Sequence, residues 1–131
     1  MRLSRLDGIR VLLVDDSPPV REVVTTMLEA YGATVTTVGT ADEALEALAR
    51  TRPDVLLSDI QMPGKGGYWL IGQVRALPPQ SGGATPAAAL TGLIGPEHRA
   101  SVLRAGFQYH IEKPVQLRAL IGVVGILALK E

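Results

Sequence analysis

The chain has 131 residues, no cysteine and 13 basic against 13 acidic side chains, which gives a formal net charge of zero. The balanced charge argues against a nucleic-acid-binding surface, the absence of cysteine excludes disulfides and thiolate metal sites, and no apolar run is long enough to span a bilayer. With 47% hydrophobic residues, we expect one globular domain in the cytoplasm, without membrane contact.

The amino-terminal residues indicate a linker followed by a strand and a helix. Residues 1–8 lack the apolar stretch of a signal peptide, and we interpret them as an N-terminal linker before a domain at 9–131. Residues 9–14 are an apolar run, which predicts a first strand. Ser17 and Pro18 are residue types preferred at a helix start, because Ser accepts a backbone N–H and Pro lacks one.

Two further strands and a second helix follow. Residues 34–38 are rich in β-branched side chains, which favour a strand. Thr40 and Glu43 form a capping box, so we expect a second helix to begin there. Residues 55–57 are an apolar run typical of a strand buried on both faces, and Asp59 comes where this third strand ends.

The second half of the chain continues the alternation. Gly66 and Gly67 leave the backbone free to turn after the third strand. Apolar patterns then predict a helix from Tyr68 to Leu77, a strand at 87–90, a helix between Gly95 and Gly106, a strand at 107–112 and a helix from Leu117 to Leu127. The helix after Gly95 has a thin apolar face, formed mainly by Val102 and Leu103.

Five strands that alternate with five helices are typical of right-handed βαβ units and a parallel sheet. We therefore predict an α/β, flavodoxin-like, doubly wound (βα)5 fold, with a five-stranded parallel sheet of order 2-1-3-4-5. Strands one and three flank the point where the strand order reverses. Ligands of such sheets bind there, beyond the carboxyl ends of the strands.

Polar side chains come at the carboxyl ends of four predicted strands. Asp15 and Asp16, the acidic pair, follow the first strand; Asp59 follows the third, Thr91 the fourth and Lys113 the fifth. Because the carboxyl ends of parallel strands open on one edge of the sheet, we expect these side chains to meet in a shallow pocket. A lone aspartate is usually a loop cap, but four strands that end in this way indicate a shared site.

This pocket predicts a divalent metal and a nucleophile. Three close carboxylates repel one another, and Mg²⁺ would relieve the repulsion while keeping several of its waters. The acidic pair, Asp59 and the backbone carbonyl of Gln61 are the candidate ligands. Asp59 is also the candidate nucleophile, because carboxylates attack phosphoryl groups. The Lys113 ammonium and the Thr91 hydroxyl would bind the charge that spreads over the phosphoryl oxygens.

Four short motifs carry a resemblance to a known family. Val-Asp-Asp-Ser follows the first strand, Asp-Ile-Gln-Met-Pro-Gly the third, Leu-Thr the fourth and Glu-Lys-Pro the fifth, within a stretch from about Ile9 to Leu129. Together they resemble the bacterial response-regulator receiver domain of two-component signalling. The residues around the last strand most resemble receivers attached to hybrid sensor histidine kinases.

The resemblance implies that Asp59 takes a phosphoryl group from a phosphohistidine on a histidine kinase or histidine phosphotransfer domain, with Mg²⁺ required. Thr91 would then move toward the phosphoryl group and shift a surface formed by helix four, strand five and helix five, which is also the expected surface for a homodimer. Such a domain assists its own phosphorylation and dephosphorylation and is not a stand-alone metabolic enzyme. In the family, the peptide bond before the residue equivalent to Pro114 is usually cis.

Several residues allow two interpretations each. His110 stands where the family usually has Tyr or Phe, and is either part of a pH-tuned switch or a half-buried strand residue without a special role. Trp69 is either an anchor for a partner or a side chain folded over the neighbouring loop. Val123 and Ile126 give the last helix a second apolar face, which either docks a partner or second copy or packs locally.

Two other functions compete with a phospho-accepting receiver. A degenerate receiver would serve only as a protein-interaction scaffold, but all five site residues are present. A nucleotide- or flavin-binding enzyme could share the fold. However, neither a G-x-G-x-x-G motif nor a P-loop follows the first strand, and the acidic pair there would repel a phosphate that lacks its metal.

Overall fold

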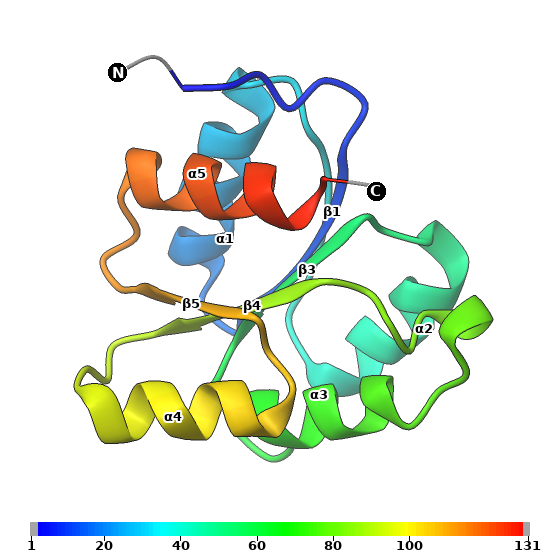
Figure 1. Cartoon of the computed structure of the whole chain (residues 1–131). Helices are drawn as coiled ribbons and strands as arrows, with labels where there is room; N and C mark the ends of the chain where they lie inside the picture. The colour runs from blue at the N-terminus through cyan, green and yellow to red at the C-terminus, as the bar shows by residue number, and fades with distance from the viewer. Residues whose placement is uncertain (1–2, 130–131) are drawn as a thin grey trace.

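Five strands and five α-helices alternate along residues 3–129, the part of the chain that the computed structural model describes (Figure 1). The elements are β1 (Arg10–Val14), α1 (Pro18–Ala30), β2 (Thr34–Val38), α2 (Ala41–Thr51), β3 (Val55–Asp59), α3 (Gly67–Arg75), the 3-10 turn η1 (Pro79–Ser81), β4 (Ala87–Thr91), α4 (Pro96–Ala105), β5 (Tyr109–Glu112) and α5 (Leu117–Leu127). None of the helices in this range has the length and apolar character needed to cross a bilayer. The first two residues of the expected linker and the last two of the expected domain lie outside the described residues.

The sheet is parallel throughout and has the order β2-β1-β3-β4-β5, which confirms the predicted fold. β3 is the central strand, and its last residue, Asp59, pairs with Leu90 of β4. β1 lies on the other side of β3, so the strand order reverses between β1 and β3. The carboxyl ends of these strands therefore form the edge at which doubly wound sheets bind their ligands.

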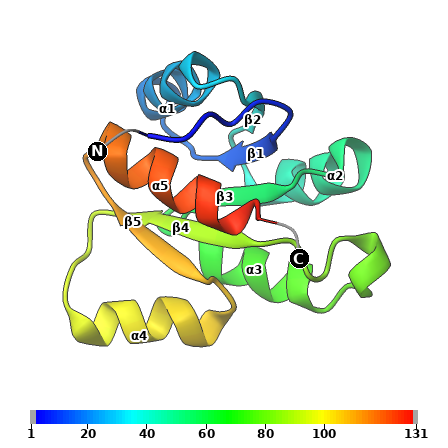
Figure 2. The same ribbon diagram turned by 45° about the horizontal axis from the view of Figure 1, so that its top comes forward.

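Helices cover both faces of the sheet (Figure 2). Each strand sends alternate side chains to these two faces. On one face α2, α3 and α4 pack over strand residues such as Leu12 and Leu56. On the other face α1 and α5 pack over residues such as Leu13 and Leu57. Because neighbouring residues of one strand enter different cores, β3 begins with a continuous apolar run instead of an alternating pattern.

The predicted starts of α1 and α2 are present as caps. The Ser17 hydroxyl accepts the N–H of Val20 at 3.4 Å. The Thr40 hydroxyl accepts the N–H of Glu43 at 3.2 Å, and the Glu43 carboxylate turns back to accept the N–H of Gly39. These bonds satisfy N–H groups that the first turn of a helix leaves unpaired, so local sequence determines where both helices begin.

The segment interpreted as a linker packs against the domain where the structure describes it. Leu6 is 1% exposed and belongs to the hydrophobic cluster between the sheet, α1 and α5. Its N–H donates to the carbonyl of Tyr31, directly after α1, at 2.7 Å. Two leucines in so short a polar segment are too few to give a periodic signal, and the burial of Leu6 depends on the space that the two helices leave. Leu6 is therefore part of the core, and Leu3 packs against it, although the residues between and after them are exposed.

The fourth helix has a narrower apolar face than the sequence indicated. Val102 is fully buried, but Leu103, which we expected beside it, is 47% exposed. Consecutive residues of an α-helix point about 100° apart, so both cannot face the sheet fully. Leu93 and Ile94, in the loop before α4, are also exposed.

Candidate functional site

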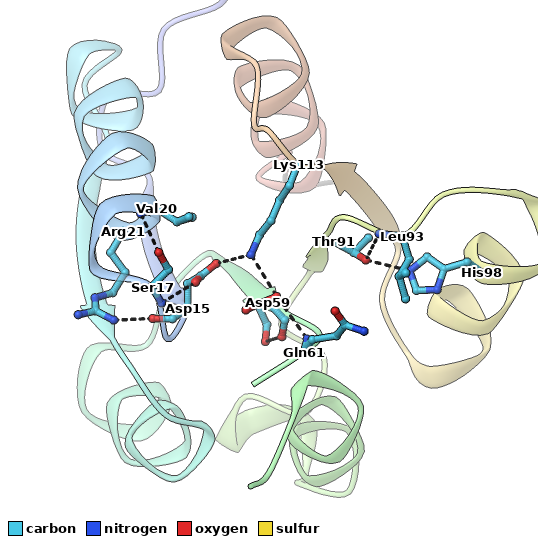
Figure 3. Close-up of polar contacts among 11 residues, drawn as sticks. Asp15, Ser17, Val20, Arg21, Asp59, Gln61, Thr91, Leu93, His98 and Lys113 are labelled. Carbon is cyan, nitrogen blue, oxygen red and sulfur yellow. Dashed lines mark hydrogen bonds and ion pairs between the residues drawn. The ribbon is translucent and has the colours of Figure 1, made fainter. Parts of the chain in front are cut away.

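The acidic pair lies where β1 ends and the chain turns into α1. Figure 3 shows Asp15, the first residue of the pair, beside Ser17. Asp15 is fully buried, and one of its carboxylate oxygens accepts the N–H of Ser17 at 2.9 Å. Its backbone carbonyl accepts a hydrogen bond from Nη1 of Arg21 at 2.6 Å. Asp16 is exposed. The pair thus offers one carboxylate that is fixed by the backbone and one that faces solvent.

Asp59 is the last residue of β3 and is 5% exposed. One of its carboxylate oxygens accepts the N–H of Gln61 at 3.3 Å. The loop then returns so closely that a Cβ on Gly67 would overlap the carbonyl oxygen of Asp59, and a Cβ on Gly66 would lie 2.8 Å from another backbone oxygen. Gly66 has an ordinary φ of −94°. These glycines are therefore needed for close approach of α3 to β3, and not for the freedom to turn that we expected.

Lys113 joins the buried carboxylates. Its Nζ lies 2.9 Å from an oxygen of Asp15 and 3.2 Å from an oxygen of Asp59. Burial raises the pKa of Asp59 and repulsion from Asp15 raises it further, while Lys113 opposes both effects. Burial by itself would lower the pKa of Lys113, but its hydrogen bonds and attraction to the two carboxylates outweigh burial, so its pKa is raised. Lys113 therefore remains an ammonium ion between two carboxylates that repel each other.

A third carboxylate gives the cluster a negative charge. Oxygens of Asp15, Asp16 and Asp59 lie within 4.8 Å of one another. Against these three carboxylates, the part of the chain that the structure describes provides one ion-paired cation, Lys113. Oxygen ligands in this number fit a hard divalent cation such as Mg²⁺. Gln61 is adjacent through its N–H, and the use of its carbonyl as a ligand stays a prediction.

Thr91 ends β4 and lies at the border of this cluster. Its buried hydroxyl accepts the N–H of Leu93 at 3.0 Å and is hydrogen-bonded to Nε2 of His98, in the first turn of α4, at 3.1 Å. Both partners lie on the side of Thr91 that faces away from Asp59 (Figure 3). Among the residues of the described range, no hydrogen bond joins Thr91 to Asp59. The hydroxyl is thus near the site but bonded to other groups.

Sequence reasoning missed two residues of this region, Arg21 and His98. Arg21 lies one turn into α1, a position from which a long side chain can reach back to the end of β1. His98 lies seven residues after Thr91, across an exposed loop, and no spacing rule connects the two. Both contacts depend on how a helix is placed relative to a strand.

His110 is a half-buried residue of β5. Burial lowers its pKa, the charges of Arg99 and His98 act in the same direction, and Glu112 opposes them. The imidazole of His110 is therefore neutral at neutral pH. Its part in a switch stays a prediction.

The other residues singled out in the sequence have clear surroundings. The peptide bond before Pro114 is cis. Trp69 is half-buried against the core, with Nζ of Lys65 4.5 Å from the centre of its ring, as in the loop-packing interpretation. Val123 packs against the core of the α1 and α5 face, whereas Ile126 is 53% exposed.

Comparison with known proteins gives the family. The sequence model of the response regulator receiver domain family matches residues 11–125 of the chain. The chain is 45% identical to an uncharacterised 14.6 kDa protein from the sodA1 3′ region of Leptolyngbya boryana, over 93% of this chain and 92% of that one. It is 32% identical to the probable transcriptional regulatory protein TcrX of Mycobacterium tuberculosis, over 95% of this chain but 55% of that protein.

A solved structure agrees with the family match. The receiver domain of the sensor histidine kinase PA1611 from Pseudomonas aeruginosa PAO1 superposes with a TM-score of 0.83 at 30% identity, over 92% of this chain and 98% of that one. That structure is described with a magnesium ion coordinated in its active-site cleft. From the strand order, the polar edge of the sheet and these matches, the chain belongs to the response-regulator receiver domain family of two-component signalling.

Proposed function

We propose that this domain accepts a phosphoryl group on Asp59 from a phosphohistidine of a histidine kinase or histidine phosphotransfer domain. The observation that carries the proposal is the contact of one ammonium, Lys113, with two buried carboxylates, those of Asp15 and Asp59. Gathering like charges in a partly dry site costs free energy, so a cluster with only a structural role would be unfavourable. The cytoplasmic location and the absence of a nucleic-acid partner stay predictions.

Asp59 is the nucleophile of this proposal because its neighbours fix its carboxylate at the centre of the cluster. Oδ1 is held both by the N–H of Gln61 and by Lys113. In the transfer, an Asp59 oxygen forms a bond to phosphorus while the bond between phosphorus and the donor's imidazole nitrogen breaks. The electron pair of the broken bond stays on the imidazole, which takes up a proton from water.

The other side chains of the site would bind charge. Mg²⁺, held by the three carboxylates and the Gln61 carbonyl, would supply neutralisation of the phosphoryl oxygens. Lys113 would turn its Nζ from the carboxylates to one phosphoryl oxygen. Thr91 would donate its hydroxyl proton to another.

An apolar hollow beside the site supports a protein donor. It has a volume of about 240 Å³ and lies between α1 and the turn after β5. Its lining residues are Pro19, Val20, Val23, Val24, Lys113, Pro114 and Val115. Because Lys113 belongs both to this hollow and to the carboxylate cluster, a helix packed there would bring its histidine next to Asp59. We therefore propose the histidine-bearing helix of the phosphodonor as the occupant.

Acetyl phosphate with MgCl₂ tests the proposal without knowledge of the cognate kinase. Intact-mass spectrometry should show a gain of one phosphoryl group in the wild type, dependent on Mg²⁺, and no gain in Asp59→Asn. Asp42→Asn is the matched control and should gain mass like the wild type, because Asp42 is exposed and pairs with Lys65 outside the site. A mass gain that persists in Asp59→Asn would overturn the assignment. A wild type without any gain would favour the degenerate scaffold.

The signal would leave through the surface of α4, β5 and α5. Each of these elements has an exposed apolar residue, Leu103 in α4, Tyr109 in β5 and Ile126 in α5, which supports contact with a downstream partner or a second copy of the chain. Light scattering before and after phosphorylation measures the second case. A monomer in both states would exclude the homodimer.

A further inference from the structure

The hydrogen bond between Thr91 and His98 crosses from the sheet to α4. It joins Oγ1 to Nε2 at 3.1 Å, and the same oxygen accepts the N–H of Leu93 at 3.0 Å. A hydroxyl has one proton and two lone pairs, so two partners at these distances fix its position. Thr91 is 2% exposed, so water has little access to replace either partner. The hydroxyl is therefore held toward the helix.

The same bond attaches the first turn of α4 to the sheet, whereas the other end of the helix is held at its C-cap, where the carbonyl of Gly106 accepts a hydrogen bond from Arg75 of α3 at 3.0 Å. Within the described part of the chain, no other side-chain hydrogen bond joins α4 to a different element, since the hydrogen bonds of Glu97, Ser101 and Arg104 stay within the helix. Of its ten residues, all described, Val102 alone is buried. Residues 92–95, which lead into the helix, are exposed. A helix with so few contacts moves at low cost, and each contact has a large share in fixing its position.

We propose that His98 is a positioning residue that latches Thr91 in the resting domain and couples its movement to α4. The inference rests on the proposed function, in which the Thr91 hydroxyl turns toward a phosphoryl oxygen on Asp59. To do so, the hydroxyl leaves both partners on the α4 side, and the first turn of α4 loses its attachment to the sheet. Without Nε2 of His98, the hydroxyl has one competitor fewer, so the phosphorylated conformation is easier to reach.

Two substitutions of His98 separate the hydrogen bond from the shape of the side chain. His98→Phe keeps a planar ring and removes the nitrogens, whereas His98→Gln keeps an amide that can bond to the Thr91 hydroxyl. The probe is beryllium fluoride with MgCl₂, a mimic of a phosphoryl group on a carboxylate. Its dissociation constant is measured through the fluorescence of Trp69, the single tryptophan. Ser101→Ala is the control on the same helix, since Ser101 bonds only within α4.

We expect His98→Phe to bind the probe roughly threefold to tenfold more tightly than the wild type, the factor that corresponds to one net hydrogen bond. His98→Gln and Ser101→Ala should stay close to the wild type. A general loosening of α4 would instead affect Ser101→Ala and would not be reversed by Gln. Equal affinities of the wild type and His98→Phe would overturn the latch.

Nitrogen NMR of the wild-type imidazole gives a second readout, which needs no His98 variant to fold. The Nε2 signal of His98 should shift when the probe is added, and also in Thr91→Val without the probe. An Nε2 signal that shifts neither with the probe nor in Thr91→Val would overturn the latch. The proposed function would still hold in that case if acetyl phosphate adds a phosphoryl group to Asp59. A wild type with neither mass gain nor probe binding would overturn the proposed function and the latch with it.

Discussion

Replacing Lys113 by Met tests how far one ammonium compensates the acidic cluster. Nζ contacts Asp15, whose side chain is 0% exposed, and Asp59, whose side chain is 7% exposed. Met has a similar length and no charge, so both carboxylates lose their partner. Breaking a buried ion pair from one side costs about 3–5 kcal/mol. Because the Lys113 side chain is 24% exposed and solvent screens part of the interaction, we expect a loss of about 2–3 kcal/mol.

Urea unfolding at pH 7.5 without Mg²⁺ measures this loss as a lower midpoint with an unchanged slope. For a domain of this size, the same loss lowers Tm by about 6–15 °C. Lys65→Met is the matched control. Its partner Asp42 has a side chain that is 68% exposed, and Nζ of Lys65 also lies over the ring of Trp69, so removal of both contacts should cost no more than about 1 kcal/mol.

The loss of stability in Lys113→Met should depend on pH, and the direction of this dependence follows from the pKa of Asp59. Burial raises the pKa of Asp59, and removal of Lys113 takes away an attraction that opposes the increase. An acid with a raised pKa in the folded state costs nothing when protonated, and its cost grows as the pH rises through that pKa. The Lys113 pKa is raised from 10.5, so the charge of Lys113 in the wild type does not change in this range. The gap between Lys113→Met and the wild type should therefore narrow as the pH falls from 7.5 toward 4.

Either of two results would refute this reasoning. One is a Lys113→Met variant as stable as Lys65→Met at pH 7.5. The other is a stability gap that does not change with pH.

Three further predictions concern Asp59, His110 and Arg75. Without Mg²⁺, Asp59→Asn should be more stable than the wild type, because burial and the charge of Asp15 raise the pKa of Asp59. In thermal melts this gain in stability should vanish below pH 3.8, the ordinary pKa of Asp, and grow as the pH rises. A gain that does not change with pH would contradict this cause. Burial lowers the pKa of His110 from 6.5, so the wild type loses stability as the pH falls below that value. His110→Phe has no imidazole to protonate and should lose less stability over the same pH range. Identical stability profiles of the two proteins against pH would count against this reasoning. Arg75 donates to three backbone carbonyls at 2.7 to 3.0 Å, so Arg75→Met should cost about 2–4 kcal/mol in urea unfolding. Arg104→Met, whose bond stays within α4, should cost less than about 0.5 kcal/mol.

Much of the site followed from the order of the strands. Once β1, β3, β4 and β5 are parallel and adjacent in the sheet, the residues at their carboxyl ends share one edge, whatever the helices do. The structure accordingly brings Asp15 and Asp59 to one ammonium from the end of β5, as predicted. The roles of these residues in phosphoryl transfer come from the resemblance and the chemistry, and stay proposals that the mass measurement tests.

The sequence by itself determined the elements whose signals are local: the apolar run of β3, the caps of α1 and α2, and the polar residues at the ends of β1, β3, β4 and β5. These depend on neighbours a few positions away, through backbone hydrogen bonds and side-chain periodicity. Only the tertiary structure decided that Leu6 joins the core, that His98 bonds to Thr91 and that Arg75 binds carbonyls of two distant loops. The physical reason is that such contacts depend on the distance between packed elements, which no short pattern in the chain encodes.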